Sequence, residues 1–284
     1  MQKKLIINID DVGLSRAVNE AVKECHVRGV SVETSLMSVG EAFEEACSMF
    51  KDLGRESTGV HLTLTGNFLP CASRKNVGSL IRENGQFYKD YFKLLSMLLG
   101  GKLKSKEIEL EFEEQIKKIK DNGFEITHLD SHEHIHMMPA IFHITVNLAK
   151  KYNIPYIRIP KERTSSMMKS FKMKDVVRQF VLKAAVFGKK RTVFKNGLMC
   201  NDEFLGHFHS GRMNDDVLCS LLPGVKEGVT ELGVHVAVHD PGFLNKFPWY
   251  KNGQIELNML LNGKWRKRIK TLNIEVVTHR EISS

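Results

Sequence analysis

Short apolar segments that alternate with amphipathic helical patterns limit the fold of this sequence more than any other feature. Six segments rich in apolar and β-branched residues predict strands at residues 4–9, 59–65, 124–130, 154–159, 233–238 and 274–277. Four segments between them predict helices at residues 16–28, 41–53, 106–122 and 140–152. Strands that alternate with helices form parallel sheets, because each crossover needs a long connection. The sequence therefore predicts an α/β fold with a parallel sheet.

The sequence predicts a single domain over residues 1–284. Its 284 residues suit one large or two small domains, but no Ser-, Gly- or Pro-rich linker and no internal repeat divides it. Residues 162–213 are the least regular stretch and combine several Met with many Lys. We interpret this stretch as an insertion that could cover a site, and a surface excursion without function fits it equally well.

Composition excludes several classes of protein. With 42% hydrophobic and 26% charged residues, the chain has the balance of a soluble globular protein. The apolar run from Leu5 to Ile9 is too short for a signal peptide or a membrane span. Five cysteines without a CxxC pair predict free thiols in a reducing compartment, so we expect a cytoplasmic protein. The net charge of +9 is spread over lysine-rich stretches without interleaved aromatic residues, which favours a solvated surface over nucleic-acid binding.

Polar residues at the carboxyl ends of the predicted strands are the candidates for chemistry, because ligands of parallel α/β proteins bind there. Asp10 and Asp11 follow the first strand. Adjacent side chains of an extended chain point to opposite sides, so one carboxylate could hold a metal ion while the other faces a bound water. The competing interpretation is that one of them caps the helix that begins near Ser15. His61, within GVHLTLT, is by itself more typical of a core or surface histidine than of a ligand.

A histidine-rich segment carries the strongest functional signal. Residues 128–139 read HLDSHEHIHMMP, with four histidines and two carboxylates within nine residues at a predicted strand end. Imidazole and carboxylate groups are ligands for zinc and other divalent metals. His132 and His136 share a face if the segment is helical, whereas His132, His134 and His136 share one if it is extended. Asp130 could orient an imidazole from behind.

The ligand types indicate what such a metal would do. The constellation has no thiolate, and an Asp with two His leaves coordination positions open, which is typical of a catalytic metal. A metal with open positions activates water and polarises carbonyl groups, so hydrolysis is the natural reaction class. The alternative interpretation of the segment is a polar loop or an adventitious metal patch.

Four motifs resemble the YdjC-like carbohydrate deacetylases, which include chitooligosaccharide and hopanoid-pathway deacetylases. The motifs are LIINIDDVGLS, GVHLTLTG, HLDSHEHIHMMP and IRIPKE, in this order over residues 5–162. The resemblance implies a distorted TIM-like (β/α) barrel related to the polysaccharide deacetylases. It also implies removal of acetyl groups from N-acetylated mono- or oligosaccharides with one divalent metal ion.

The resemblance also implies roles for individual residues. Asp11, His61 and His132 would be the metal ligands, and Asp10 would be the general base that takes a proton from the metal-bound water. Arg158, in IRIP, would lie near the substrate, and a surface salt bridge is the equally weighted alternative for it. From the residues themselves, Asp130 and His136 are expected to support the ligands from behind. The family commonly carries a His-Pro-Gly acid motif near the end, where this chain reads VAVHDPGF. Its acid is therefore expected at His239, although alignment on Pro241 and Gly242 would place Asp240 there.

The sequence leaves open the identity of the metal ion, two alternative functions and the oligomeric state. Asp with two His suits zinc, and magnesium, manganese, cobalt and nickel also occupy sites with open positions. Histidine and aspartate clusters also build phosphoesterases, but the chain has no Gly-rich phosphate loop. A sugar- or nucleic-acid-binding protein without catalysis is the alternative outside enzymes. Whether the chain forms a homo-oligomer is left open by the sequence.

Overall fold

The named strands all run parallel and form one curled sheet. The computed structural model describes residues 2–163 and 182–283. Neighbouring strands follow the order β5-β4-β3-β2-β1-β7-β6, and β8 pairs with the first residues of β1. The strands are β1 (Lys3–Val12), β2 (Glu33–Leu36), β3 (Ser57–Leu62), β4 (Glu125–Ser131), β5 (Tyr156–Ile157), β6 (Glu203–Leu205), β7 (Gly228–Val234) and β8 (Ile274–Val276).

The curled sheet approaches closure between β5 and β6. Tyr156 of β5 forms a parallel bridge with Met199. The backbone N–H of Phe204 in β6 donates to the carbonyl oxygen of Lys161 at 2.9 Å. The prediction of a distorted parallel α/β barrel is therefore confirmed.

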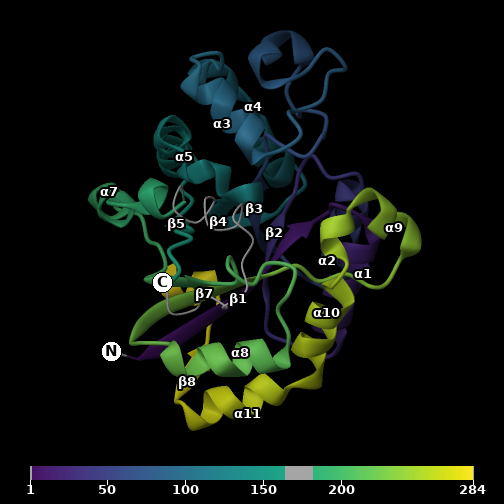
Figure 1. Cartoon of the computed structure of the whole chain (residues 1–284), viewed down its shortest axis with the longest axis vertical. Coiled ribbons are helices and arrows are strands. Elements are labelled where there is room, and N and C mark those ends of the chain that lie inside the picture. The colour runs from purple at the N-terminus through teal and green to yellow at the C-terminus, as the bar shows by residue number, and fades with distance from the viewer. Residues whose placement is uncertain (1, 164–181, 284) are drawn as a thin grey trace.

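Helices cover the outside of this barrel, with α3, α4 and α5 on one side and α8, α10 and α11 on the other (Figure 1). Ile108, Phe112, Ile116 and Ile119 of α4 are all fully buried, as their spacing in the sequence indicates. The helices are α1 (Arg16–Val27), α2 (Phe43–Asp52), α3 (Tyr91–Leu99), α4 (Ser105–Asp121), α5 (Pro139–Lys151), α7 (Lys189–Lys195), α8 (Asp215–Leu221), α9 (Pro241–Lys246), α10 (Gly253–Asn262), α11 (Lys264–Thr271) and α12 (His279–Ser283). Two 3-10 turns matter for the site, η3 (His132–Met137) and η6 (Pro248–Tyr250).

The stretch at 162–213 contributes to the barrel itself. Residues 164–181 of the predicted insertion lie outside the described residues. The remainder contains α7 and β6, and β6 pairs with β7 in parallel register. The described part of this stretch therefore includes a barrel strand.

The cysteines and the helix lengths bear on the compartment and on membrane insertion. All five cysteines are free, as their odd number and spacing predicted. Among residues 2–163 and 182–283, no helix combines the length and the apolar character that a membrane crossing requires.

Candidate active site

The carboxyl ends of the parallel strands bring the candidate residues to one end of the barrel. Asp10 and Asp11 stand near the end of β1, and His61 stands near the end of β3. His132 follows β4 directly, and Arg158 follows β5. Since parallel strands all end on the same side of the sheet, these residues converge although up to 148 positions separate them along the chain.

The backbone at Asp11 explains how two adjacent carboxylates reach the same cavity. Asp11 has a φ of 60°, in the left-handed region that residues other than glycine seldom adopt, although Asp and Asn do so more often than most. The pairing of β1 with β2 is irregular between Ile9 and Val12. This local break in the extended chain cancels the usual alternation, so Asp10 and Asp11 both line the cavity. Strain of this kind is often retained at functional sites.

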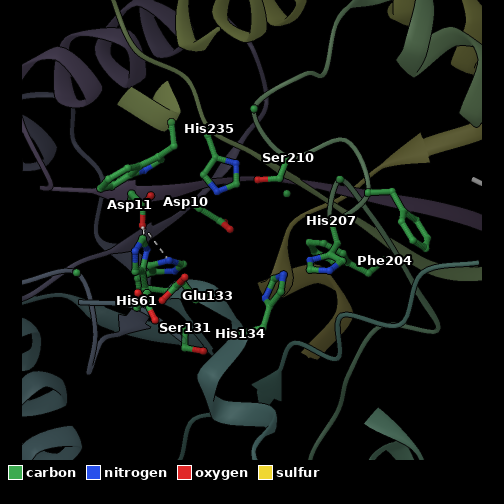
Figure 2. A pocket seen from close by; sticks show the side chains of 18 of the residues that line it. Asp10, Asp11, His61, Ser131, Glu133, His134, Phe204, His207, Ser210 and His235 are labelled. Carbon is green, nitrogen blue, oxygen red and sulfur yellow. Dashed lines mark hydrogen bonds and ion pairs between the residues drawn. The ribbon is translucent and has the colours of Figure 1, made fainter. Parts of the chain in front are cut away.

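Asp11, His61 and His132 form a compact cluster. Oδ1 of Asp11 lies 3.1 Å from Nε2 of His61 and 2.9 Å from Nδ1 of His132. One ligand atom from each residue lies within 4.8 Å of the other two. The structure thus brings together the three residues that the resemblance implied as metal ligands. The dashed lines in Figure 2 mark contacts of Asp11.

The charged groups of the cluster favour a positive charge between Asp11, His61 and His132. Burial lowers the pKa of His61, but the carboxylates of Asp130 and Asp11 outweigh burial and raise this pKa to about 10. Burial likewise lowers the pKa of His132, and Asp11 raises it above its ordinary value. Burial raises the pKa of Asp11, while the two imidazoles hold it well below the usual range. A divalent cation supplies the same positive charge when the imidazoles release their protons.

The donor set fits a divalent transition metal. Nδ1 of His61 lies 2.8 Å from Oδ1 of Asp130, which acts as the hydrogen-bond partner behind the imidazole. When Nδ1 donates to Asp130, the lone pair of Nε2 points toward Asp11, the arrangement that metal-binding histidines commonly have. Two imidazole nitrogens and one carboxylate oxygen are the ligand types of catalytic zinc sites.

Two other groups of residues have similar spacing but fit a metal less well. Rings of His128 and His279 stack with centroids 3.7 Å apart and an interplanar angle of 19°, and Glu33 completes their group. Because imidazole lone pairs lie in the ring plane, two stacked rings do not aim at one ion. The other group combines His61 with Asp10 and Asp130, but Arg158 already pairs with both carboxylates.

Arg158 is the centre of a buried ion network. Its side chain is fully buried and pairs with Asp10, Asp130 and Glu231 at 2.8, 2.7 and 2.6 Å. Both terminal nitrogens donate to Asp10, one to each oxygen. The structure therefore places Arg158 behind Asp10, where it orients that carboxylate, instead of in the cavity where substrate contact was expected. The guanidinium also lowers the pKa of Asp10, although burial raises it.

Asp130 lies behind the cluster and contacts a candidate ligand, whereas the side-chain hydrogen bonds of His136 go to Ser131 and Arg158 and not, as expected, to a ligand. Nε2 of His136 donates to the carbonyl oxygen of Arg158 at 2.9 Å, and Nδ1 contacts the hydroxyl of Ser131. His136 thereby fixes the backbone at Arg158, whereas Asp130 contacts His61 directly. The segment after β4 is neither a regular helix nor a strand, because Glu133 and His134 have φ of 55° and 56°.

A cavity of about 410 Å³ opens beside the cluster. Figure 2 shows Asp10, Asp11 and His61 on one side, with His134, His207 and Phe204 on the other. Trp249 also lines the cavity and is 46% exposed. Another part of the cavity wall comes from the described part of the predicted insertion and consists of Phe204, Gly206, His207, Phe208, Ser210, Gly211 and Arg212.

Comparison with known proteins identifies the family of this chain. The model of the YdjC-like protein family matches residues 4–271. The chain belongs to the YdjC-like family. It is 29% identical over 275 residues to a carbohydrate deacetylase from Thermoanaerobacter pseudethanolicus, covering 96% of each chain. It is 34% identical over 155 residues to a chitooligosaccharide deacetylase from an Enterobacter species, covering 54% of this chain and 58% of the relative.

A solved structure resembles this YdjC-like chain along its whole length. The protein, from Enterococcus faecalis, is described as a candidate cellobiose-phosphate cleavage protein. It superimposes with a TM-score of 0.80 at 26% sequence identity and covers 100% of both chains.

A further histidine that lines the cavity of this YdjC-like chain, His235, is not among the candidates predicted from the sequence. The strand predicted at 233–238 lies instead at Gly228–Val234, so His235 is the first residue after β7. His235 lines the cavity beside Asp10 and Ser210 (Figure 2). Its Nδ1 is buried and has no hydrogen-bond partner in the described part of the chain.

His239 and Asp240 have other positions than the His-Pro-Gly comparison suggested. His239 is exposed, and its backbone N–H donates to Gln254. The carboxylate of Asp240 accepts from the backbone N–H of Phe243 at 2.8 Å and caps α9. The Pro-Gly pair thus begins a helix outside the cavity. A strand ending at Val234 would have identified His235, since it is the polar residue that follows directly.

Proposed function

We propose that this protein is a metal-dependent carbohydrate deacetylase that hydrolyses the acetamido group of an N-acetylated saccharide. The observation that carries the proposal is the convergence of Asp11, His61 and His132 next to Asp10 in one cavity. Relatives named carbohydrate and chitooligosaccharide deacetylases support the substrate class. The free thiols are consistent with the cytoplasmic location predicted from the sequence.

Asp11, His61 and His132 would hold one divalent ion, for which zinc fits the donor set best and magnesium is the alternative. When bound, such an ion lowers the pKa of water and polarises a carbonyl oxygen. The proton transfers of the proposed mechanism are carried out by side chains of this chain.

Asp10 is the proposed general base. It is only 3% exposed, lines the cavity and is fixed by both terminal nitrogens of Arg158. The pairing leaves Asp10 ionised, because the guanidinium lowers its pKa against the effect of burial. A positioned carboxylate of this kind takes a proton from the attacking water as the water bonds to the amide carbon.

His235 is the proposed general acid. As the tetrahedral carbon collapses, the C–N bond breaks and a protonated imidazole gives its proton to the leaving amine. His235 lines the same cavity near Asp10 (Figure 2), so it can receive the proton that Asp10 has accepted. The products are acetate and the free amino sugar.

The cavity has the size and lining for a saccharide. Its volume of about 410 Å³ lies within the range of small-molecule sites. Trp249 offers a flat apolar face for the C–H side of a pyranose ring. Polar side chains such as Lys89, Ser210 and Arg212 lie at the same cavity and can meet sugar hydroxyls.

Acetate release from a panel of N-acetylated mono- and oligosaccharides tests the proposal. We expect release by the wild-type protein, loss of release after chelation and recovery on adding zinc or magnesium. Asp10→Asn should lower kcat by about 100- to 10,000-fold while metal binding persists. Saccharide binding without acetate release by the metal-loaded protein would contradict the proposal and favour a binding protein, and release of phosphate from phosphorylated sugars would favour a phosphoesterase.

A further inference from the structure

Tyr250 is buried behind the candidate metal centre and contacts it directly. Its side chain is 2% exposed, and its hydroxyl donates to Oδ2 of Asp11 at 2.9 Å. Oδ1 of the same carboxylate faces His61 and His132. The two oxygens of Asp11 therefore have different partners, one toward the cluster and one toward the phenol.

Local packing holds the phenol in this position. Tyr250 ends the turn η6, whose first residue Pro248 fixes the backbone φ, and its ring packs against Phe243 with centroids 5.1 Å apart. A Cβ at Gly253 would lie 3.2 Å from the Tyr250 ring and 2.9 Å from Ala237. Gly253 thus leaves room for the ring, and the hydroxyl reaches Asp11 from a rigid base.

We propose that Tyr250 is a positioning residue that keeps Asp11 a one-oxygen metal ligand. The inference rests on the proposed function, because it concerns the metal centre of that function. A carboxylate can rotate about its last torsion and offer either one oxygen or both to a cation. The hydrogen bond from Tyr250 occupies Oδ2 and stops this rotation, so Oδ1 alone stays directed at the two imidazoles.

A fixed ligand has two consequences for the centre. Binding of the ion costs less entropy, because the carboxylate is already oriented before the ion arrives. A carboxylate that uses one oxygen also leaves more coordination positions open for water and substrate than one that uses both. Partners of this kind behind a metal ligand commonly change metal affinity by about 10- to 100-fold.

Tyr250→Phe removes only the hydroxyl and tests this inference. The matched control is Tyr156→Phe, because Tyr156 is also buried and donates to a carboxylate, that of Glu231, at 3.0 Å. Glu231 belongs to none of the three clusters that could hold a metal among the described residues. Zinc dissociation constants of the three proteins would be measured by competition with a chromophoric chelator, and thermal unfolding of the metal-free proteins would check their folding.

We expect Tyr250→Phe to raise the zinc dissociation constant about 10- to 100-fold and Tyr156→Phe to leave it within about threefold of wild type. With cobalt bound, the visible absorption of Tyr250→Phe should differ from that of wild type, whereas Tyr156→Phe should reproduce the wild-type spectrum. Unchanged or tighter zinc binding by Tyr250→Phe, or equal weakening in both variants, would overturn the inference.

These measurements are independent of deacetylation. If wild type binds zinc but releases no acetate from any saccharide, the proposed function fails while the affinities still decide the role of Tyr250. If wild type releases acetate and Tyr250→Phe binds zinc normally, only the inference about Tyr250 fails. If wild type binds no divalent ion, both are overturned.

Discussion

Two histidines, His235 and His239, are candidates for the residue that protonates the leaving amine in the proposed reaction. His235 lines the cavity, whereas His239 is exposed and lies just before α9. We expect His235→Asn to lower kcat for acetate release by about 100- to 10,000-fold, because the leaving amine loses its proton donor.

The matched variant His239→Asn should keep kcat close to that of wild type. Steady-state acetate release by both variants, loaded with the same metal, provides the comparison. A large loss in His239→Asn together with a normal rate in His235→Asn would return the acid role to the residue favoured by the sequence alone.

The sequence predicts a site residue when the end of the strand that carries it can be recognised. Asp10, Asp11 and His132 stand at or next to the carboxyl ends of strands that apolar residues identify, whereas His61 lies inside the strand predicted at 59–65 and is indicated as a ligand by the family resemblance. The sequence could not show that Arg158 is buried, since its contacts with three carboxylates arise only when distant strands meet. Tyr250 carries no signal at all, because its role depends on the path of the chain after β7.

At the scale of elements, short strands and turns escape periodicity. β2 has four residues and β6 has three, too few for an alternating pattern to separate them from loops. The four predicted helices are each present within a few residues of their expected ends. The strand predicted at residues 233–238 ends earlier in the structure, at Val234. The prediction runs too far because residues 235–238, HVAV, continue the apolar pattern of β7.

The cavity wall at 206–212 is tied to the barrel by a buried carboxylate. Oε2 of Glu162 accepts from the backbone N–H of Phe208 at 2.8 Å. Burial raises the pKa of Glu162 from 4.5 to about 7, although the backbone N–H groups oppose this change. The folded protein therefore holds a proton on Glu162 at pH values where the unfolded chain has lost it.

This carboxyl group predicts a pH-dependent stability. Its contribution is complete below about pH 4.5 and is lost as the pH rises through about 7. The free energy of unfolding of Glu162→Gln should improve relative to wild type by about 2 kcal/mol between pH 5 and pH 8, because Gln has no proton to lose. Urea unfolding at both pH values measures this difference. Glu109→Gln, at an exposed position of α4, is the control, and a difference that is constant with pH would contradict the prediction.

For the molecule as a whole, Arg158 joins strands that are far apart in sequence. It follows β5 and pairs with carboxylates from β1, β4 and β7. Arg158→Met should lower the free energy of unfolding by about 3–5 kcal/mol, because three buried carboxylates lose their counter-charge. Arg16→Gln, which removes an exposed pair with Glu20, should have little effect. Similar urea midpoints for Arg158→Met and wild type would contradict this account of the barrel.

The proposed function depends most on where a metal ion binds. A crystal grown with zinc, with anomalous diffraction recorded at the zinc absorption edge, answers this question directly. We expect one strong anomalous peak within bonding distance of Asp11, His61 and His132. A peak among Glu33, His128 and His279 instead, or no peak at the first cluster under saturating zinc, would contradict the proposed active site.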